Sequence, residues 1–214
     1  MKISEHTVSE DFVRGHLGHV FLVEDDRSAL SSMSRELSSE GYRVYPFESP
    51  ELFLQFVTPV SPACVLLDMR MPNMLGLEVQ KQLKSMDISM PVVFMSGEST
   101  VEQAVSALES GAIQFLIKPF GRKPLLEAVS KAMAHDRSLQ REMVHKRSQL
   151  ERISKLAPRE REVLDLLVAG YAHQEISDKM GISYGTAKQY KGNIFIKLNI
   201  QTMAELIELM RSVD

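Results

Sequence analysis

Four short apolar runs in the first part of the chain each end in residues that carry charge or a hydroxyl group. The runs cover residues 19–23, 64–67, 92–95 and 115–117. Apolar runs of this length predict strands that are buried on both faces. If the strands are parallel, their carboxyl ends meet at one edge of the sheet. The residues that directly follow the four runs are Glu24, Asp25, Asp26, Asp68, Ser96 and Lys118. We therefore expect these side chains to lie close together.

Helical patterns separate these runs. Apolar residues recur at spacings near three and four over 28–40, 76–86 and 100–110, and Gly41 and Gly111 stand where two of these helices would end. Strands that alternate with helices predict an α/β fold, a doubly wound parallel sheet with its site at the switch point of the strand order.

The acidic residues at this edge indicate metal and phosphate chemistry. Clustered carboxylates repel one another, and a bound cation lets them stay ionised together. Hard oxygen ligands at an open edge suit Mg²⁺, which accepts one or two carboxylates together with a substrate phosphate. A carboxylate such as Asp68 can itself attack phosphorus and form an aspartyl phosphate. The alternative is that Asp68 only caps the turn after its strand.

Two other classes of protein share parts of this pattern. An aspartate-nucleophile phosphohydrolase also uses a strand-end Asp and Mg²⁺, but it needs a second acid two residues further on, where this chain has Arg70. A flavodoxin-like cofactor binder needs a phosphate-cradling loop, and the loop after Val23 is acidic. Both classes fit the residues less well than a phosphoacceptor site.

Composition limits the remaining possibilities. A chain of 214 residues holds one or two domains. No apolar run approaches the roughly 20 residues that a membrane span needs, and the chain does not begin with a signal pattern, so we expect a cytoplasmic protein. The single cysteine, Cys64, excludes internal disulfides.

Residues 123 to about 154 predict one long helix. Leu139, Met143, Leu150 and Ile153 fall on an approximate heptad seam, although Lys146 interrupts it. The sequence leaves two interpretations open, a linker that pairs in a dimer and a solvated connector.

The remaining sequence predicts four helices. Pro158 stands at the first position of the first helix, and the second covers His173–Met180. A tight turn at 181–183 leads to a third helix, from about 184 to 198. Two helices joined by a turn that contains Gly form a helix-turn-helix, whose second helix enters the major groove of DNA.

Charge supports DNA binding only locally. Residues 151–214 carry nine basic and nine acidic residues, so this part of the chain is not basic overall. Between residues 179 and 204, however, acids are absent from the sequence and four lysines occur: Lys179, Lys188, Lys191 and Lys197. The basic face of one helix, rather than net charge, therefore indicates DNA binding.

These motifs resemble a known family. The segment from about residue 19 to 134 resembles the receiver domain of two-component response regulators. Residues 156–210 resemble the helix-turn-helix domain of the LuxR/NarL type, with Pro-Arg-Glu-Arg-Glu-Val-Leu at 158–164 and Gly-Ile-Ser at 181–183. Together they resemble a response regulator of the FixJ/NarL type, and the resemblance covers most of the chain.

The resemblance implies a role for each polar residue at the sheet edge. It implies a flavodoxin-like receiver with five parallel strands in the order 2-1-3-4-5. Asp68 would be the phosphoacceptor; Glu24, Asp25 and the backbone carbonyl of Arg70 would join it in holding Mg²⁺; Ser96 and Lys118 would contact the phosphoryl group; and Phe115 would be the aromatic residue that moves with Ser96. The Lys118–Pro119 peptide bond would be cis.

The resemblance and the helix-turn-helix pattern together predict the DNA contacts. Lys188 and Lys191 can bind phosphates or guanine edges, and Gln189 can read an adenine edge. The residues expected to face DNA are Thr186, Lys188, Gln189, Lys191, Asn193 and Lys197. The residues expected to form the core beneath them are Ile176, Ile182, Ala187, Ile194 and Leu198.

The resemblance implies four segments: an N-terminal extension (1–17), a receiver domain (18–134), a helical linker (135–154) and a LuxR-type DNA-binding domain (155–214). It implies a transcription factor rather than an enzyme, with only self-phosphorylation and self-dephosphorylation as chemistry. The implied partners are a sensor histidine kinase, promoter DNA, RNA polymerase and a second copy of the chain after phosphorylation. The alternative is a receiver that controls protein interaction or oligomerisation, with weak or no DNA binding.

Two local features depart from the family pattern or modulate it. Ala157 replaces the usual Thr cap before Pro158, which should weaken the start of that helix by about 0.5–2 kcal/mol. Arg70 and Glu98 each lie two residues beyond a site residue. We expect them to meet over the site and to alter the lifetime of the phosphoryl group.

Overall fold

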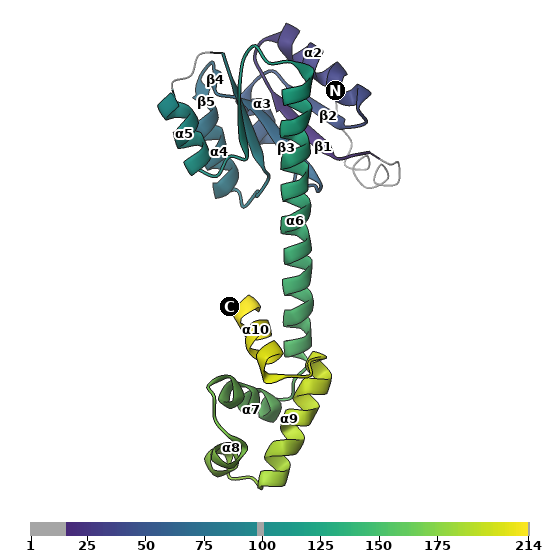
Figure 1. Cartoon of the computed structure of the whole chain (residues 1–214). Coiled ribbons are helices and arrows are strands. Elements are labelled where there is room, and N and C mark those ends of the chain that lie inside the picture. The colour runs from purple at the N-terminus through teal and green to yellow at the C-terminus, as the bar shows by residue number, and fades with distance from the viewer. Residues whose placement is uncertain (1–15, 98–100, 214) are drawn as a thin grey trace. The chain divides into compact units, whose positions relative to one another are not determined.

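The computed structural model describes residues 16–97 and 101–213, with the side chains of 101–103 left aside (Figure 1). The chain divides into two compact units, and the boundary lies between Gln140 and Arg141. Most of the expected N-terminal extension, and Glu98, lie outside the described residues. In the part of the chain that is described, none of the helices is both long and apolar enough to cross a membrane.

The first unit is built on a five-stranded sheet. Its strands are β1 (His19–Val23), β2 (Arg43–Phe47), β3 (Ala63–Asp68), β6 (Val92–Ser96) and β7 (Gln114–Ile117). All four pairings are parallel, and the order is β2-β1-β3-β6-β7. The predicted doubly wound sheet is confirmed, and the order changes direction at β1 and β3, the strands that end in the acidic residues.

Helices cover both faces of this sheet, which explains why its strands are apolar without alternation. The helices of the unit are α2 (Arg27–Ser39), α3 (Pro50–Phe56), α4 (Gly76–Ser85), α5 (Val101–Glu109) and the first part of α6 (Arg122–Ser154). Alternate β3 residues enter two different cores: Val65 and Leu67 pack with residues of α3, α4 and α5, whereas Cys64 and Leu66 pack with residues of α2 and α6. Both sides of a central strand are therefore buried.

A short hairpin lies between β3 and α4 and has no counterpart in the predicted elements. Its two strands, β4 (Arg70–Met71) and β5 (Met74–Leu75), pair antiparallel, and Asn73 adopts φ 70° in the turn. Two-residue strands are too short to show a period of two, so the sequence pattern could not reveal them. The hairpin matters because it begins two residues after Asp68.

Helix α6 contributes to both units. Its Leu125, Val129 and Met133 are buried in the first unit. Asp136 is also buried there, and its carboxylate accepts hydrogen bonds from the Ser61 hydroxyl (2.6 Å) and the Ala63 N–H (3.0 Å). In the second unit Ile153 is buried in the core, so it is not part of an exposed seam. The predicted heptad seam is therefore wrong at Ile153, because tertiary packing uses that side chain.

The second unit is an all-helical fold. Besides the end of α6 it contains α7 (Pro158–Val168), α8 (His173–Met180), α9 (Tyr184–Leu198) and α10 (Met203–Val213). Gly181, with φ 65°, makes the turn between α8 and α9. The predicted core is confirmed: Ile176, Ala187, Ile194 and Leu198 are buried, and Ile182 packs against them.

Helix ends in this unit follow the local sequence. The Ser183 hydroxyl accepts a hydrogen bond from the Thr186 N–H (3.1 Å) and caps α9. Ala157 offers no cap to α7, as expected, but the Glu160 carboxylate accepts a hydrogen bond from the Ala157 N–H (2.8 Å). Asn199 ends α9 in the left-handed region, at φ 54° and ψ 52°. Asn tolerates this conformation better than most residues that carry a Cβ.

The left-handed end of α9 yields a first prediction. Asn199→Ala should lower the free energy of unfolding of the second unit by about 1 kcal/mol, because an ordinary side chain is strained at this φ. Asn199→Gly should leave it unchanged or raise it. Urea unfolding of the full chain, followed by hydrogen exchange of the α9 amides, measures both changes. Equal stability of the Ala and Gly variants would contradict this view of the helix end.

Candidate functional site

The carboxyl ends of four strands converge in the first unit, as the sequence predicts. Glu24 and Asp25 follow β1, and Asp68 is the last residue of β3. One carboxylate oxygen from each of these three residues lies within 4.8 Å of the other two. Ser96 ends β6, and Lys118 follows β7. The structure thus brings together residues that lie up to 94 positions apart in sequence.

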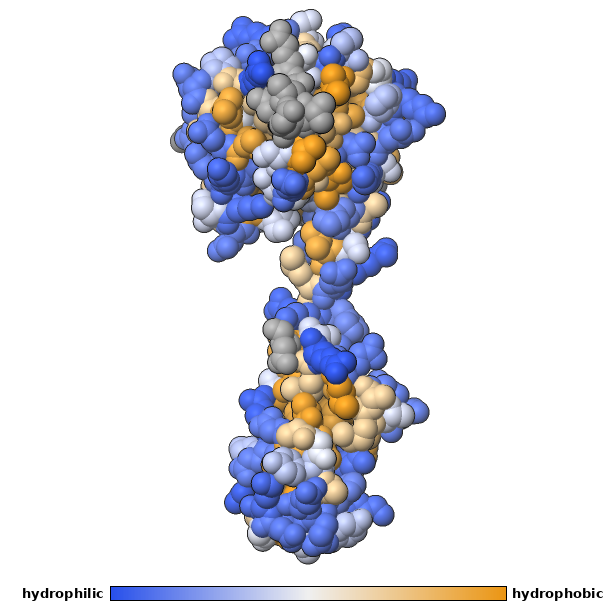
Figure 2. All heavy atoms as spheres, turned by 60° about the vertical axis from the view of Figure 1, so that its left-hand side comes forward, coloured by the Kyte–Doolittle hydropathy of each residue, from blue (hydrophilic) through white to orange (hydrophobic). Residues whose placement is uncertain are grey.

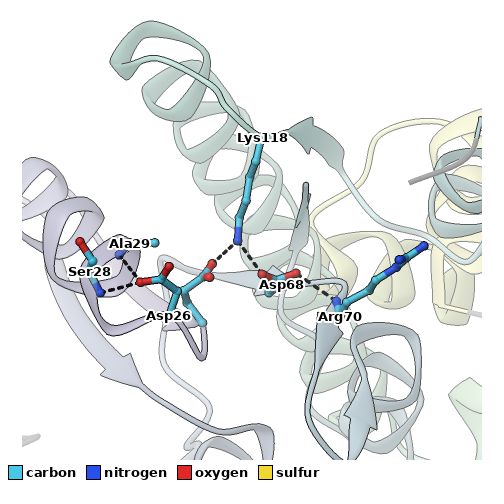
Figure 3. Close-up of polar contacts among 7 residues, drawn as sticks. Asp26, Ser28, Ala29, Asp68, Arg70 and Lys118 are labelled. Carbon is cyan, nitrogen blue, oxygen red and sulfur yellow. Dashed lines mark hydrogen bonds and ion pairs between the residues drawn. The ribbon is translucent and has the colours of Figure 1, made fainter. Parts of the chain in front are cut away.

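Lys118 binds the two buried carboxylates of this cluster. Its Nζ atom lies 2.5 Å from Asp68 Oδ2 and 2.5 Å from Glu24 Oε2, and Figure 3 shows the side chain reaching toward Asp68. Burial raises the pKa of Glu24 and outweighs the hydrogen bond from Lys118. Burial also disfavours the charged Lys118 ammonium, but hydrogen bonds to Asp68 and Glu24 prevail and raise its pKa. Lys118 therefore stays protonated at this edge.

The third member of the acidic run has a structural role. Asp26 caps α2, where its carboxylate accepts hydrogen bonds from the N–H groups of Ser28 (2.7 Å) and Ala29 (3.1 Å). These backbone hydrogen bonds lower the pKa of Asp26. Asp25 differs because it is exposed and one of its carboxylate oxygens lies within 4.8 Å of oxygens of Glu24 and Asp68. The geometry therefore separates two candidate ligands from one helix cap.

The backbone after Asp68 is tied to its carboxylate. Asp68 Oδ1 accepts a hydrogen bond from the Arg70 N–H (3.0 Å). The Arg70 side chain is exposed, and in Figure 3 it points away from the acidic cluster. Because its expected partner Glu98 lies outside the described residues, the predicted pairing of these two side chains stays a prediction.

The two candidate switch residues occupy neighbouring strands. Ser96 is buried at the end of β6. Phe115 lies on β7 opposite Phe94 and is partly buried against the core between the sheet and α3, α4 and α5. The Lys118–Pro119 peptide bond is cis, as expected from the resemblance, and Ser61–Pro62 is a second cis bond that the sequence did not suggest.

These residues fit a hard divalent cation. Three carboxylates from β1 and β3 supply oxygen atoms close enough for one ion, and their acidic surroundings suit Mg²⁺. Glu24, Asp25 and Asp68 would hold the ion. The place of the Arg70 carbonyl among its ligands remains a prediction.

A second candidate site lies on the exposed face of α9. Lys188, Gln189 and Asn193 are exposed there. The Thr186 hydroxyl shares a hydrogen bond with the Ser183 hydroxyl (2.8 Å), so it also helps to start the helix. Lys191 is partly buried, and its Nζ lies 5.2 Å from the centroid of the Phe195 ring. With Lys197, four of the six predicted DNA-facing side chains are exposed on α9.

Lys197 has a role that sequence reasoning missed. Its Nζ lies 2.6 Å from Oε2 of the buried Glu160. This hydrogen bond lowers the pKa of Glu160, and the Ala157 N–H adds to the effect. The contact joins the start of α7 to the end of α9, 37 positions along the chain. Helix periodicity reports neighbours three or four residues apart and therefore carries no sign of such a pair.

A strand-end Asp beside an acidic pair and a Lys, on a sheet of this order, defines a receiver domain. Residues 20–130 match the family described as the response regulator receiver domain, and residues 154–210 match the luxR family of bacterial regulatory proteins. The chain belongs to the two-component response regulators that join a receiver domain to a LuxR-type helix-turn-helix domain.

Individual relatives agree with both matches. The chain is 34% identical to the transcriptional regulatory protein TdiR of Thauera aromatica, over 92% of this chain and 86% of that protein. It is 31% identical to the transcriptional regulatory protein FixJ of Bradyrhizobium diazoefficiens, over 90% and 94% of the two chains. The solved structure of the response regulator StyR has a TM-score of 0.76 and 33% identity, and covers 91% of this chain and 98% of its own. The resemblance predicted from the sequence is confirmed.

The buried ion pair of the second unit yields a second prediction. Lys197→Met should lower the free energy of unfolding of this unit by about 1–3 kcal/mol, because it leaves a buried carboxylate without its ammonium partner. Lys197→Met combined with Glu160→Gln should recover part of the loss. Urea unfolding of the full chain measures the three values.

The same pair should depend on pH in a defined direction. The pKa of Glu160 is lowered from its ordinary value of 4.5, so its contribution is complete above that pH and is lost as the pH falls through the lower, folded value. The stability difference between wild type and Lys197→Met should therefore shrink in acid. A difference that stays constant would show that the ion pair does not stabilise this unit.

Proposed function

We propose that this protein is a phosphorylation-dependent transcriptional regulator. In this proposal Asp68 accepts a phosphoryl group from a partner histidine kinase, and the modified protein dimerises and binds promoter DNA in the cytoplasm. Residues 18–134 would form the receiver, 135–154 the linker and 155–214 the DNA-binding domain. The contact of the Lys118 ammonium with the Asp68 carboxylate, 2.5 Å long and beside two further acids, is the observation that supports it best.

The proposed chemistry needs a carboxylate nucleophile and positive charge near it. An Asp68 oxygen forms a bond to phosphorus as the phosphorus–nitrogen bond of the donor histidine breaks. Lys118, which now contacts Asp68, would bind the phosphoryl oxygens and neutralise their charge. A bound Mg²⁺ would supply further charge neutralisation at the same place. The protein would otherwise act by positioning, with self-dephosphorylation as its only hydrolytic activity.

The new phosphoryl group would change the nearby surface. Its oxygens accept hydrogen bonds, and the Ser96 hydroxyl at the end of the adjacent strand can donate one. Phe115, which is only partly buried, would follow Ser96 inward. This is a local event that biases an existing equilibrium between two conformations.

Exposed apolar residues mark a surface that dimerisation would cover. Val105 and Leu108 on α5 and Ile117 on β7 are between 46% and 67% exposed. Figure 2, where the side of the first unit with α4 and α5 comes forward, shows apolar residues among hydrophilic ones. A homodimer through α5 and β7 would bury them, and movement at Phe115 would control its formation.

The second unit would read DNA through α9. We propose that Lys188 and Lys191 bind phosphates or guanine edges, while Thr186, Gln189 and Asn193 contact base edges or the backbone. Lys197, which binds Glu160, would act mainly by holding α9 in place. A dimer would set two such helices on paired half-sites and present the promoter to RNA polymerase.

The proposed switch yields a third prediction. Beryllofluoride with Mg²⁺ should convert wild-type protein from monomer to dimer in sedimentation velocity, because it imitates the phosphoryl group on Asp68. Asp68→Asn should remain monomeric under the same conditions. A dimer in both proteins, with or without beryllofluoride, would move the control of assembly away from Asp68.

The proposed DNA face yields a fourth prediction. Lys188→Gln combined with Lys191→Gln should weaken promoter binding and reduce the slope of log affinity against log salt by about 2, because two phosphate contacts are lost. Lys155→Gln, which removes an exposed charge outside α9, is the matched control. Fluorescence anisotropy with a labelled promoter measures both. An unchanged slope would favour the alternative, in which this domain mediates protein interactions.

A further inference from the structure

A cavity of about 280 Å³ lies in the first unit at the amino-terminal edge of the sheet. Pro91 and Val92, at the start of β6, form part of its wall, and Asp68 lies at the opposite ends of the strands. Leu83 on α4, Ile113 before β7 and Leu139 on α6 supply further apolar wall. The cavity is therefore distinct from the phosphoacceptor site, and apolar groups make up much of its lining.

Gln80 is the unusual residue of this cavity. It lines the cavity from α4 and is only 4% exposed. Among the described residues nothing donates to or accepts from its side-chain amide, and its amide atoms are not among the fully buried unpaired atoms, so they are accessible from the cavity. The amide of Gln80 therefore presents a free donor and a free acceptor to whatever occupies the cavity.

Two residues of opposite charge line the same cavity. Lys84 and Asp87 both line the cavity and are exposed, and the structure records no ion pair between them. Lys84 donates one hydrogen bond, to the Ser110 carbonyl (2.8 Å), and two of its ammonium protons remain. A ligand that uses both charges must carry a carboxylate and an ammonium group.

We propose that this cavity binds an apolar α-amino acid. The carboxylate of the ligand pairs with Lys84, its ammonium group pairs with Asp87, and its apolar side chain packs against Leu83 and Val92. The Gln80 amide hydrogen-bonds to the polar end of the ligand. An apolar acid or an apolar amine would leave one of the two charges unpaired.

The position of the cavity allows a bound ligand to regulate the receiver. Leu139 and His135 reach it from α6, so a bound ligand stabilises the packing of α6 against the receiver. Its other wall is the start of β6, the strand that ends at Ser96. A ligand that prefers one arrangement of these elements shifts the receiver equilibrium by its difference in affinity for the two states.

Calorimetry on the full-length protein tests the proposal with L-phenylalanine as the probe. We expect one saturable site for phenylalanine. 3-Phenylpropanoate, which lacks the ammonium group, and phenethylamine, which lacks the carboxylate, should each bind about fivefold more weakly or worse. Failure of phenylalanine to bind at millimolar concentration overturns the proposal, and so does equal binding of all three compounds, which would indicate an apolar crevice.

Four variants test which residues recognise the ligand. Lys84→Ala and Asp87→Asn should each weaken phenylalanine binding, and Asn is compatible with the φ of 56° at position 87. Lys81→Ala, on the exposed side of the same helix and outside the cavity, is the matched control and should bind normally. Gln80→Leu should abolish binding while the thermal stability changes little, since the amide that is removed has no hydrogen-bond partner among the described residues. Unchanged binding in Gln80→Leu, or equal losses in the Lys81 and Lys84 variants, overturns the proposal.

Discussion

The contact of Lys118 with two buried carboxylates is the interaction on which the receiver unit depends. Glu24 and Asp68 are nearly inaccessible to water, and two negative charges in one such place repel each other strongly. The Lys118 ammonium, 2.5 Å from each, offsets this repulsion. The contact joins residues at the ends of three parallel strands. The charge balance of the site therefore depends on the order of the strands in the sheet. In the proposed mechanism, a phosphoryl group on Asp68 would redistribute this charge balance, and the site would act as a switch.

The sequence predicts those features of the fold that depend on residues close together along the chain. The runs that end at Asp68, Ser96 and Lys118 identify buried strands and place their polar ends at one edge. The helix-turn-helix is equally local, since Gly181 and Ser183 set the turn and the cap that begin α9. These elements could be predicted because propensity, patterning and tertiary packing agree there.

The remaining features depend on contacts between distant residues. Periodicity does not report that Lys197 binds Glu160, or that Ile153 leaves the expected seam for a core. The acidic run is ambiguous in sequence, because a helix cap and a metal ligand are both served by Asp; only the backbone geometry after Asp26 separates them. Gln80 resembles an ordinary helix-surface residue in sequence, and only its burial beside a cavity distinguishes it. Such features arise from the packed structure as a whole.

Chemical trapping of the phosphorylated residue tests the central claim most directly. The full-length protein would be incubated with Mg²⁺ and a small phosphoryl donor, then reduced with borohydride, which converts an aspartyl phosphate to homoserine. Mass spectrometry of the peptide that contains Asp68 would then locate the change. The account predicts homoserine at position 68 and little conversion in Lys118→Ala. Conversion at another residue, or full modification without Lys118, would contradict it.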